Sequence, residues 1–473
     1  MIPSMKKVET LSPAAQTPPW WRRLLSDSLL SERALTLSTL VVALGFLGSK
    51  ILGLAREVLI ARAFGTSAEL DAFRVANTFS DMLDSVIAGA TITAVFIPVF
   101  SIYLARDQAA RREGWRFASA VLNDMFLLMF GIVTLGIVFA PQLIENFIAP
   151  GFSPAQSALA VDLMRIVLLA AIVFAVSGTI TGILHAHNRF ALVALAGPLH
   201  NLGIIGALFF LVPSMGIYGL AWGIVLGSLL HLGIQIPGLI RSGMLWFATL
   251  GAGQSSMREL LRLLGPRIIT TNVGSLTRLI TNNLASFLSI GSISALNYAY
   301  MLWQFPETLI GTAIGVAVFP RLAQRAAARD AQGFARLFNI ALFTILALSL
   351  PAALIAVFFA QPIVTLVLER GAFDASSTAL VAPALRFYAL AIVGEAILEL
   401  VARSFYAQRN SKTPMFVALA GMALRIGLML WWRELYGASG LAFAYGIGVC
   451  FEAGALYILA RRSFLKTVDS RAA

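Results

Sequence analysis

Charged residues are scarce in this chain: they fill 12% of its 473 positions, against about a quarter in soluble proteins. Hydrophobic residues make up 59%. Runs of roughly 20 apolar residues, long enough to cross a bilayer, recur from residue 36 to residue 460. The polar stretches between them are too short for a catalytic domain. We therefore predict an all-α integral membrane protein that is not an enzyme.

Cysteine and histidine are also rare, which removes several kinds of site. The single Cys450 excludes an internal disulfide and a cysteine-rich metal cluster. His185 and His187 stand two residues apart, so they do not share a helix face, and no carboxylate lies near them in the sequence. No nucleophile–base pair or phosphate-binding loop stands out. We expect neither a metal nor a cofactor.

The net charge of +12 would fit a nucleic-acid partner only if the basic residues formed a patch, and they lie mostly between the apolar runs. If both termini are cytoplasmic, 25 of the 35 Lys and Arg fall on the cytoplasmic side, and only Arg370 and Arg433 fall in loops on the other side. This asymmetry follows the positive-inside rule. It predicts two cytoplasmic termini and no nucleic-acid partner.

The apolar runs predict twelve transmembrane helices. Their expected bounds are 36–64, 71–103, 117–149, 159–184, 191–212, 217–240, 268–290, 294–319, 338–367, 378–402, 414–434 and 438–460. Residues 1–35 are expected to be a cytoplasmic tail and not a cleaved signal peptide. Residues 243–257 are expected to link an N-lobe (36–242) to a C-lobe (258–464), and residues 465–473 to form a second cytoplasmic tail.

The two predicted lobes resemble each other at a nearly constant offset. The matches are Gly89–Ile92 with Gly311–Ile314, His187–Arg189 with Arg409–Ser411, Ala194–Gly197 with Ala418–Gly421, and Gly219–Trp222 with Gly440–Phe443. Four matches in the same order favour a duplicated six-helix unit. Because both units would start in the cytoplasm, the repeats are parallel, and a central cavity with a substrate site is expected between the lobes.

A charged group within a span costs about 2.5 to 3.5 kcal/mol, so it normally faces a cavity or a partner. The basic residues inside or beside the predicted spans are Lys50, Arg56, Arg62, Arg74, Arg165, Arg278, Arg386 and Arg425. For Arg56 we favour a cavity role, because a guanidinium suits bidentate phosphate binding and Gly53 on the same helix face lets a ligand approach. The alternative is that Arg56 pairs with Asp71 or Asp84, and Lys50 with Glu57.

The opening block of the membrane part resembles the signature of the MurJ/MviN family of lipid II flippases. That block comprises Ser49–Glu57, Ala61–Gly65 and Asp71–Phe73, and it is followed in the family's order by Phe96–Phe100, Ala149–Phe152, Phe305-Pro306, Phe319–Leu322, Phe405–Gln408 and Lys412–Pro414. The resemblance implies a transporter of the multidrug/oligosaccharidyl-lipid/polysaccharide exporter (MOP) superfamily. Such a protein moves undecaprenyl-pyrophosphate-linked peptidoglycan precursor, lipid II, across the bacterial inner membrane by alternating access.

The resemblance also assigns roles to individual residues. Arg56 and Asp71 match functional residues of the family, and Lys50 stands where the family usually has an arginine, so the charge is kept without the guanidinium fork. Two positions depart from the pattern, since Asp84 and Met301 stand where the family carries arginines. Arg74 and Arg278 are candidates to replace them. The alternative is structural: Arg74 pairs with Asp71 or Asp81, and Arg278 with Glu307.

Glu395, Glu399 and Arg403 follow one another at intervals of four on the tenth predicted helix. They form either a salt-bridged ladder or a cation-coupling site, since driven transport needs an ion-binding group at membrane depth. Three functions therefore stay open. The first is flipping of lipid II by a protein whose other partners are the surrounding membrane lipids. The second is flipping of another polyprenyl-linked glycan, which Asp84 and Met301 favour. The third is cation-coupled drug antiport through carboxylates such as Glu395.

Overall fold

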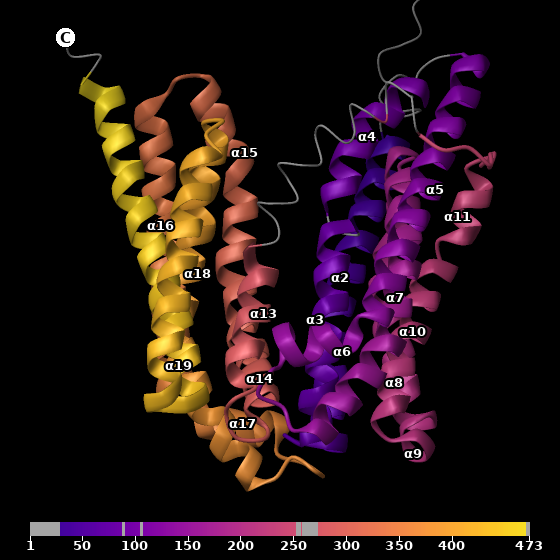
Figure 1. The fold of residues 1–473 in the computed structure, drawn as a ribbon. Coiled ribbons are helices and arrows are strands. Elements are labelled where there is room, and N and C mark those ends of the chain that lie inside the picture. Colours follow the sequence, from indigo (N-terminus) through magenta and orange to yellow (C-terminus); the bar gives the residue numbers. More distant parts are fainter. Residues whose placement is uncertain (1–28, 88–89, 105–106, 252–256, 258–272, 470–473) are drawn as a thin grey trace, which may run out of the picture.

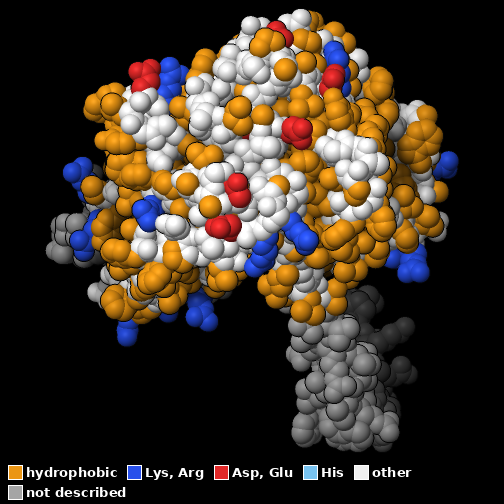
Figure 2. Space-filling view, turned by 90° about the horizontal axis from the view of Figure 1, so that it is seen from below, with side chains coloured by type: hydrophobic (Ala, Val, Ile, Leu, Met, Phe, Trp, Pro, Cys, Tyr) orange, Lys and Arg blue, Asp and Glu red, His pale blue; other side chains and the backbone are white. Residues whose placement is uncertain are grey.

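The computed structural model describes residues 29–87, 90–104, 107–251, 257 and 273–469. Within these ranges every regular element is a helix. By length and composition, seven of the described helices are apolar enough to cross a membrane. Large apolar side chains such as Phe210 and Phe343 point outward, and Figure 2 shows apolar side chains around the rim of one end with few charges among them. The chain is an all-helical membrane protein, as the sequence predicts.

The first half of the chain forms one helical bundle (Figure 1). Its long helices are α2 (Leu29–Phe64), α3 (Ala68–Ile87), α4 (Ala90–Leu104), α5 (Gln108–Val138), α7 (Pro154–Ala186), α8 (Phe190–Phe210) and α10 (Ile217–Gly233). Short pieces complete it: α6 (Ala140–Leu143), the π-helix η2 (Ile144–Ile148), α9 (Val212–Met215) and α11 (Ile236–Arg241). Helix α7 packs against α3, α5 and α10, and α8 packs against α2 and α10.

The second half forms another bundle, coloured salmon to yellow in Figure 1. It consists of α13 (Val273–Ala285), α14 (Ser292–Glu307), the π-helix η3 (Thr308–Thr312), α15 (Ala313–Ala327), α16 (Ala331–Phe358), α17 (Ala360–Leu368), α18 (Ala375–Ala407) and α19 (Lys412–Asp469). Helix α18 contacts α14, α15, α16, α17 and α19 and is the centre of the bundle. Gly437, with φ of 56°, divides α19 into two helices.

Several predicted helix bounds are wrong. The span expected at 117–149 starts at Gln108, because Asp107 caps it by accepting a hydrogen bond from the Ala110 N–H at 3.0 Å. It stops at Val138, and a new short helix begins with Pro141 in its first turn. The span expected at 338–367 runs from Ala331, breaks at Phe359 and restarts as α17. Of the span expected at 268–290, residues 268–272 lie outside the described residues.

Backbone irregularities recur 221 residues apart. Asn188 and Arg409 both have left-handed φ, of 57° and 60°, after α7 and α18. Gly216 and Gly437 share φ values of 57° and 56° between the next pair of helices. The backbone therefore pairs Asn188 with Arg409, one residue away from the sequence match of His187 with Arg409. The backbone at the helix ends therefore defines which residues of the two halves correspond, and it does so more precisely than the similarity of side chains.

The two bundles meet at one end of the molecule, at the bottom of Figure 1, and diverge toward the other. At the meeting point the Ala372 N–H donates to the Arg62 carbonyl at 2.9 Å, and the Thr66 and Ser377 hydroxyls lie 2.9 Å apart. Gly65, at φ of 57°, lies so close to the Ala372 carbonyl that no Cβ would fit. We call this the closed end. The opposite end, which carries residues 328–330 and 408–411, is the open end.

Candidate functional site

A cavity of about 320 Å³ lies between the two bundles. Helices α2, α3, α7, α8 and α10 line it from one side, and α13 and α14 from the other. Its charged lining residues are Arg56, Glu57, Arg74, Asp81, Asp84 and Arg278. Three guanidinium groups thus face three carboxyl groups in this central cavity. The cavity is polar and close to charge balance, and it gathers three of the predicted site arginines.

Glu57 joins two of these arginines. Its carboxylate accepts a hydrogen bond from Arg56 at 2.8 Å and pairs with Arg74 through its other oxygen. Arg56 also donates to the Asn201 side-chain oxygen at 3.0 Å, which fixes it to α8. The alternative from the sequence does not hold, since Arg56 pairs with neither Asp71 nor Asp84. The acidic partner of Arg56 is the next residue in the chain, Glu57.

Arg74 differs from the expectation in the same way. The sequence offered Asp71 or Asp81 as its partner, and the structure pairs it with Glu57. Its guanidinium also lies 5.6 Å from the Tyr298 ring centre, a cation–π geometry. In the described part of the chain, the Nε atoms of Arg56 and Arg74 have no hydrogen-bond partner. Both arginines therefore keep an unused donor beside the cavity.

Arg278 enters the cavity from the second bundle. It lies 3.9 Å from Asp81 of the first bundle, and both side chains are about half exposed, at 48% and 47%. Its guanidinium stands 5.8 Å from the Tyr300 ring centre. The alternative pair with Glu307 does not form, and Glu307 instead accepts hydrogen bonds from the Thr308 and Thr312 hydroxyls. Arg278 is thus held loosely, across the interface between the bundles.

The remaining predicted residues divide into those in the cavity and those outside it. Asp84 and Met301 both line it, one from each bundle. Lys50 is exposed and outside the lining, with its ammonium 5.6 Å from the Phe46 ring, so it does not pair with Glu57. Asp84 therefore adds a negative charge to a wall where the family resemblance led us to expect a positive one.

Asp71 is 2% exposed and faces the closed end instead of the cavity. One carboxylate oxygen accepts hydrogen bonds from the Ser294 N–H at 2.7 Å and the Ser294 hydroxyl at 2.6 Å. The other accepts from the Gly291 N–H at 2.7 Å. Gly291 has φ of 89°, a left-handed conformation that glycine adopts without strain. Asp71 is therefore a latch that joins α3 to the N-terminus of α14.

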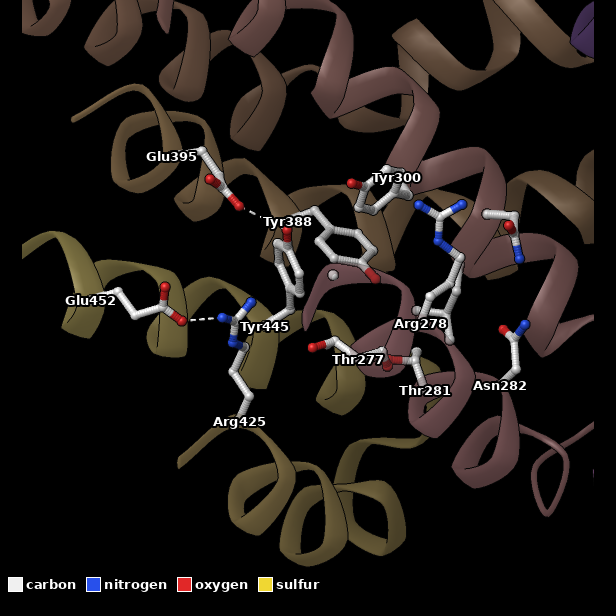
Figure 3. Close-up of a pocket in the computed structure, with 13 residues that line it drawn as sticks. Thr277, Arg278, Thr281, Asn282, Tyr300, Tyr388, Glu395, Arg425, Tyr445 and Glu452 are labelled. Carbon is white, nitrogen blue, oxygen red and sulfur yellow. Dashed lines mark hydrogen bonds and ion pairs between the residues drawn. The ribbon is translucent and has the colours of Figure 1, made fainter. Parts of the chain in front are cut away.

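A second cavity, of about 250 Å³, lies within the second bundle (Figure 3). Tyr445 on α19 donates a hydrogen bond to Glu395 on α18 at 2.8 Å, and Arg425 pairs with Glu452, both on α19. The rings of Tyr300, Tyr388 and Tyr445 lie between these groups and Arg278. One half of the predicted ladder forms, since Glu399 pairs with Arg403, but Glu395 takes no part in it.

Sequence reasoning missed the residues that hold the charged groups. Asn201 orients Arg56, and Tyr445 binds Glu395. The sequence analysis selected residues that carry a charge within a span, and neither asparagine nor tyrosine carries one, so both were overlooked. Among the described residues no three His, Cys, Asp or Glu side chains gather as a metal site. His187 instead stacks on Trp115 with ring centres 5.5 Å apart.

The two helical bundles, which close at one end over a charged cavity, have the fold of transporters of the MOP superfamily. Similar solved structures carry this fold. One is the inward-facing conformation of a multidrug resistance MATE family transporter, with a TM-score of 0.75, 14% identity, and coverage of 89% of this chain and 96% of that chain. A second is lipid II flippase MurJ in an inward closed conformation, with a TM-score of 0.79, 28% identity and 90% coverage of both chains.

The sequence comparisons define the family within that fold. The family model for lipid II flippase MurJ matches residues 60–472. The lipid II flippase MurJ of Burkholderia cenocepacia is 29% identical over 421 residues, which cover 88% of this chain and 81% of the relative. A probable lipid II flippase MurJ of Rhizobium tropici is 28% identical over 89% of this chain and 80% of the relative. The chain belongs to the MurJ lipid II flippase family, a family of transporters and not of enzymes.

Proposed function

We propose that this protein translocates lipid II across the bacterial inner membrane by alternating access. The pyrophosphate of lipid II binds among Arg56, Arg74 and Arg278, and the sugars and peptide of lipid II occupy the polar remainder of the central cavity. The observation that carries the proposal is the presence of these three guanidinium groups on one cavity, because guanidinium recognises phosphate oxygens in bidentate fashion. Glu57 holds Arg56 and Arg74 in place before the cargo arrives, whereas Arg278, held only loosely beside Asp81, can turn toward it.

The proposal includes a topology. Twelve spans form an N-lobe (36–242) and a C-lobe (258–464), joined by 243–257, with both termini in the cytoplasm. The loop charges support this orientation. With it, the open end faces the cytoplasm, and the Asp71 latch closes the cavity toward the opposite side. Release of the cargo then requires this latch to break.

A coupling cation belongs to the proposal, with Glu395 and Glu399 as its candidate sites. The pairing of Glu399 with Arg403 leaves Glu395 as the better candidate, since its described partner is the uncharged Tyr445.

Purified protein in liposomes that hold lipid II on one side tests the main proposal. We expect the wild-type protein to move lipid II to the other side, and R56A to abolish the movement. In cells, the gene should replace a MurJ flippase. A wild-type protein that is folded, yet neither binds lipid II nor moves it, would refute the proposal.

The charge balance of the cavity favours a second candidate, another polyprenyl-linked glycan. Asp84 and Met301 leave the wall without the two arginines that the family resemblance led us to expect. A cargo with less negative charge than a pyrophosphate-linked peptide glycan fits such a wall better. Competition between lipid II and other undecaprenyl-linked glycans for the same purified protein separates the two candidates.

A further inference from the structure

Helices α3 and α13 lie next to each other along the seam between the two bundles (Figure 1). Three polar pairs join them, each with one residue from either helix: Thr78 with Asn282, Asp81 with Arg278, and Ser85 with Ser275. On each helix the three residues are spaced by three and four positions, so they share one face. The residue numbers rise on α3 as they fall on α13. We call this antiparallel set the α3–α13 zipper.

The pairs of the zipper lie at successive depths. Helix α3 begins near the closed end, where Asp71 binds the start of α14, and α13 runs in the opposite direction. The pair of Thr78 and Asn282 is therefore the one nearest the closed end, and we call it the closed-side pair. Ser85 stands two residues before the last residue of α3, and Ser275 two residues after the first residue of α13. These two serines thus form the end of the zipper that points toward the open end.

We infer that Ser85 and Ser275 are the pivot on which the two bundles rock, so that their contact persists when the closed end opens and the closed-side pair separates. The inference rests on the alternating-access part of the proposed function and names the place in the fold where that motion turns. In the present state the zipper joins the bundles from the pivot toward the closed end. In the opposite state the bundles part at the closed end and meet toward the open end. The pair at the boundary is common to both states.

Two serine hydroxyls have the chemistry that a pivot needs. Their oxygens lie 3.1 Å apart, and each hydroxyl can donate one hydrogen bond and accept two, so the pair stays bonded while the helices change their angle. Ser85 donates to the Met82 carbonyl of its own helix at 2.8 Å, which leaves its lone pairs to accept from Ser275. Small side chains also let two helices stay close together within a membrane. The pivot is therefore a close contact that tolerates rotation.

The closed-side pair has the opposite character. Thr78 and Asn282 are 4% and 3% exposed, and the Asn282 amide donates to the Thr78 hydroxyl at 2.6 Å. The Thr78 hydroxyl in turn donates to the Arg74 carbonyl at 2.8 Å, so its orientation is fixed by its own helix. A change of angle that separates the helices at this depth breaks the bond outright. The closed-side pair therefore belongs, with the Asp71 latch, to the contacts that must open.

The middle pair connects the pivot to the cargo. Arg278 and Asp81 are 3.9 Å apart and half exposed, and such pairs contribute little, so the cargo can take Arg278 from Asp81 at low cost. Arg278 stands three residues from Ser275, which is about one helical turn. Displacement is smallest near a pivot. The guanidinium that the second bundle offers to the cargo therefore moves little while the cavity changes the side to which it opens.

Two matched double-cysteine variants test the pivot. Both are made in a C450S background, which removes the native cysteine. S85C/S275C places one cysteine on each helix at the pivot, and T78C/N282C does the same at the closed-side pair. Each variant is bridged by the same short bifunctional thiol reagent, which a reductant later releases. The unbridged form of each variant is its own control.

Hydrogen–deuterium exchange measures opening of the closed end without any cargo. The Gly291 and Ser294 amides donate to Asp71 at the closed end, so they exchange when that end opens. We expect a bridge at the pivot to leave their exchange within about twofold of the unbridged protein, and a bridge at the closed-side pair to slow it at least about tenfold. Equal slowing by both bridges, or none by the closed-side bridge, would overturn the inference.

Transport separates this inference from the proposed function. In liposomes the closed-side bridge should lower lipid II movement at least about tenfold until the reductant is added, and the pivot bridge should lower it less than about twofold. Movement that both bridges stop equally would overturn the pivot and leave the flippase proposal standing. If the wild type moves no lipid II and the exchange pattern still holds, the flippase proposal fails and the pivot stands.

Single substitutions cover the case in which a double-cysteine variant does not fold. S85A keeps the close approach of the helices and should lower lipid II movement less than about threefold, whereas S85L forces α3 and α13 apart and should lower it at least about tenfold. S214L makes the same change at an exposed serine of α9 and should have little effect. An S85L protein that transports as well as S85A would overturn the inference.

Discussion

Asp71 on α3 accepts two hydrogen bonds from Ser294 at the start of α14, one from the backbone N–H at 2.7 Å and one from the hydroxyl at 2.6 Å. Hydrogen bonds to a charged group contribute about 1.5 to 3 kcal/mol each. We expect D71N to weaken closure by about 2 kcal/mol, roughly 30-fold in the ratio of closed to open molecules. Distances between spin labels placed on the two bundles at the closed end measure this ratio.

Ser294→Ala provides the graded control for that latch. It removes the hydroxyl bond and keeps both backbone N–H donors, so we expect a loss of closure of about 1 kcal/mol. The order wild type, S294A, D71N should appear in the label distances. Equal distances in all three proteins would mean that packing alone closes this end.

The Arg56–Glu57–Arg74 cluster leads to a prediction about stability. E57Q leaves two guanidinium groups together without a carboxylate, and breaking a buried pair costs about 3 to 5 kcal/mol. We expect a large drop in the thermal unfolding temperature in detergent. D162N removes an exposed pair with Arg165, whose side chains are 53% and 44% exposed, and should change stability by less than about 1 kcal/mol. Similar melting of the two variants would contradict the assigned role of Glu57.

Arg278 and Asp81 lead to the opposite expectation. The pair is half exposed and 3.9 Å long, so its coupling energy in a double-mutant cycle should be below about 1 kcal/mol. The R278Q protein should therefore unfold at a temperature close to that of the wild type. Its lipid II transport should nevertheless fall at least tenfold, because the central cavity loses a guanidinium that binds the cargo. A large drop in the unfolding temperature of R278Q alongside the loss of transport would show that Arg278 is structural.

The sequence predicted the membrane class and the helical fold, because burial of apolar runs depends on residue type alone. The cost of charges in a membrane also made Lys50, Arg56, Asp71, Arg74 and Arg278 candidates, and three of these line the central cavity while Lys50 and Asp71 do not. The pairings that the sequence offered as alternatives do not form. Glu57 follows Arg56 in the chain, yet neighbouring residues on a helix usually diverge, so the sequence offered Asp71 or Asp84 as partners of Arg56 and Asp71 or Asp81 as partners of Arg74. Asn201 and Tyr445 act from helices whose placement only the tertiary structure defines.

Asp84 and Met301 offer a test of cargo choice. The double variant D84R/M301R changes the charge of the central cavity by three units toward positive. If the natural cargo is lipid II, transport of lipid II should persist or increase. If the cargo is a less anionic glycan, transport of that glycan should fall at least tenfold while lipid II gains. Competition assays with both lipids measure the ratio, and an unchanged ratio would show that these two positions do not set cargo choice.

Gly219 and Gly440 stand 221 residues apart and make the same close approach. A Cβ on Gly219 would lie 2.6 Å from the Leu211 carbonyl carbon, and one on Gly440 would meet the Trp432 backbone. Backbone cannot move aside as a side-chain end can, so G219A and G440A should each destabilise the protein by about 1 to 3 kcal/mol. G206A meets no atom within 4 Å and should be neutral or slightly stabilising, because alanine favours helices. If the halves are duplicated units that pack alike, the two variants lower the unfolding temperature by similar amounts. A large loss in one half with none in the other would show that the halves share a backbone path but not its packing constraint.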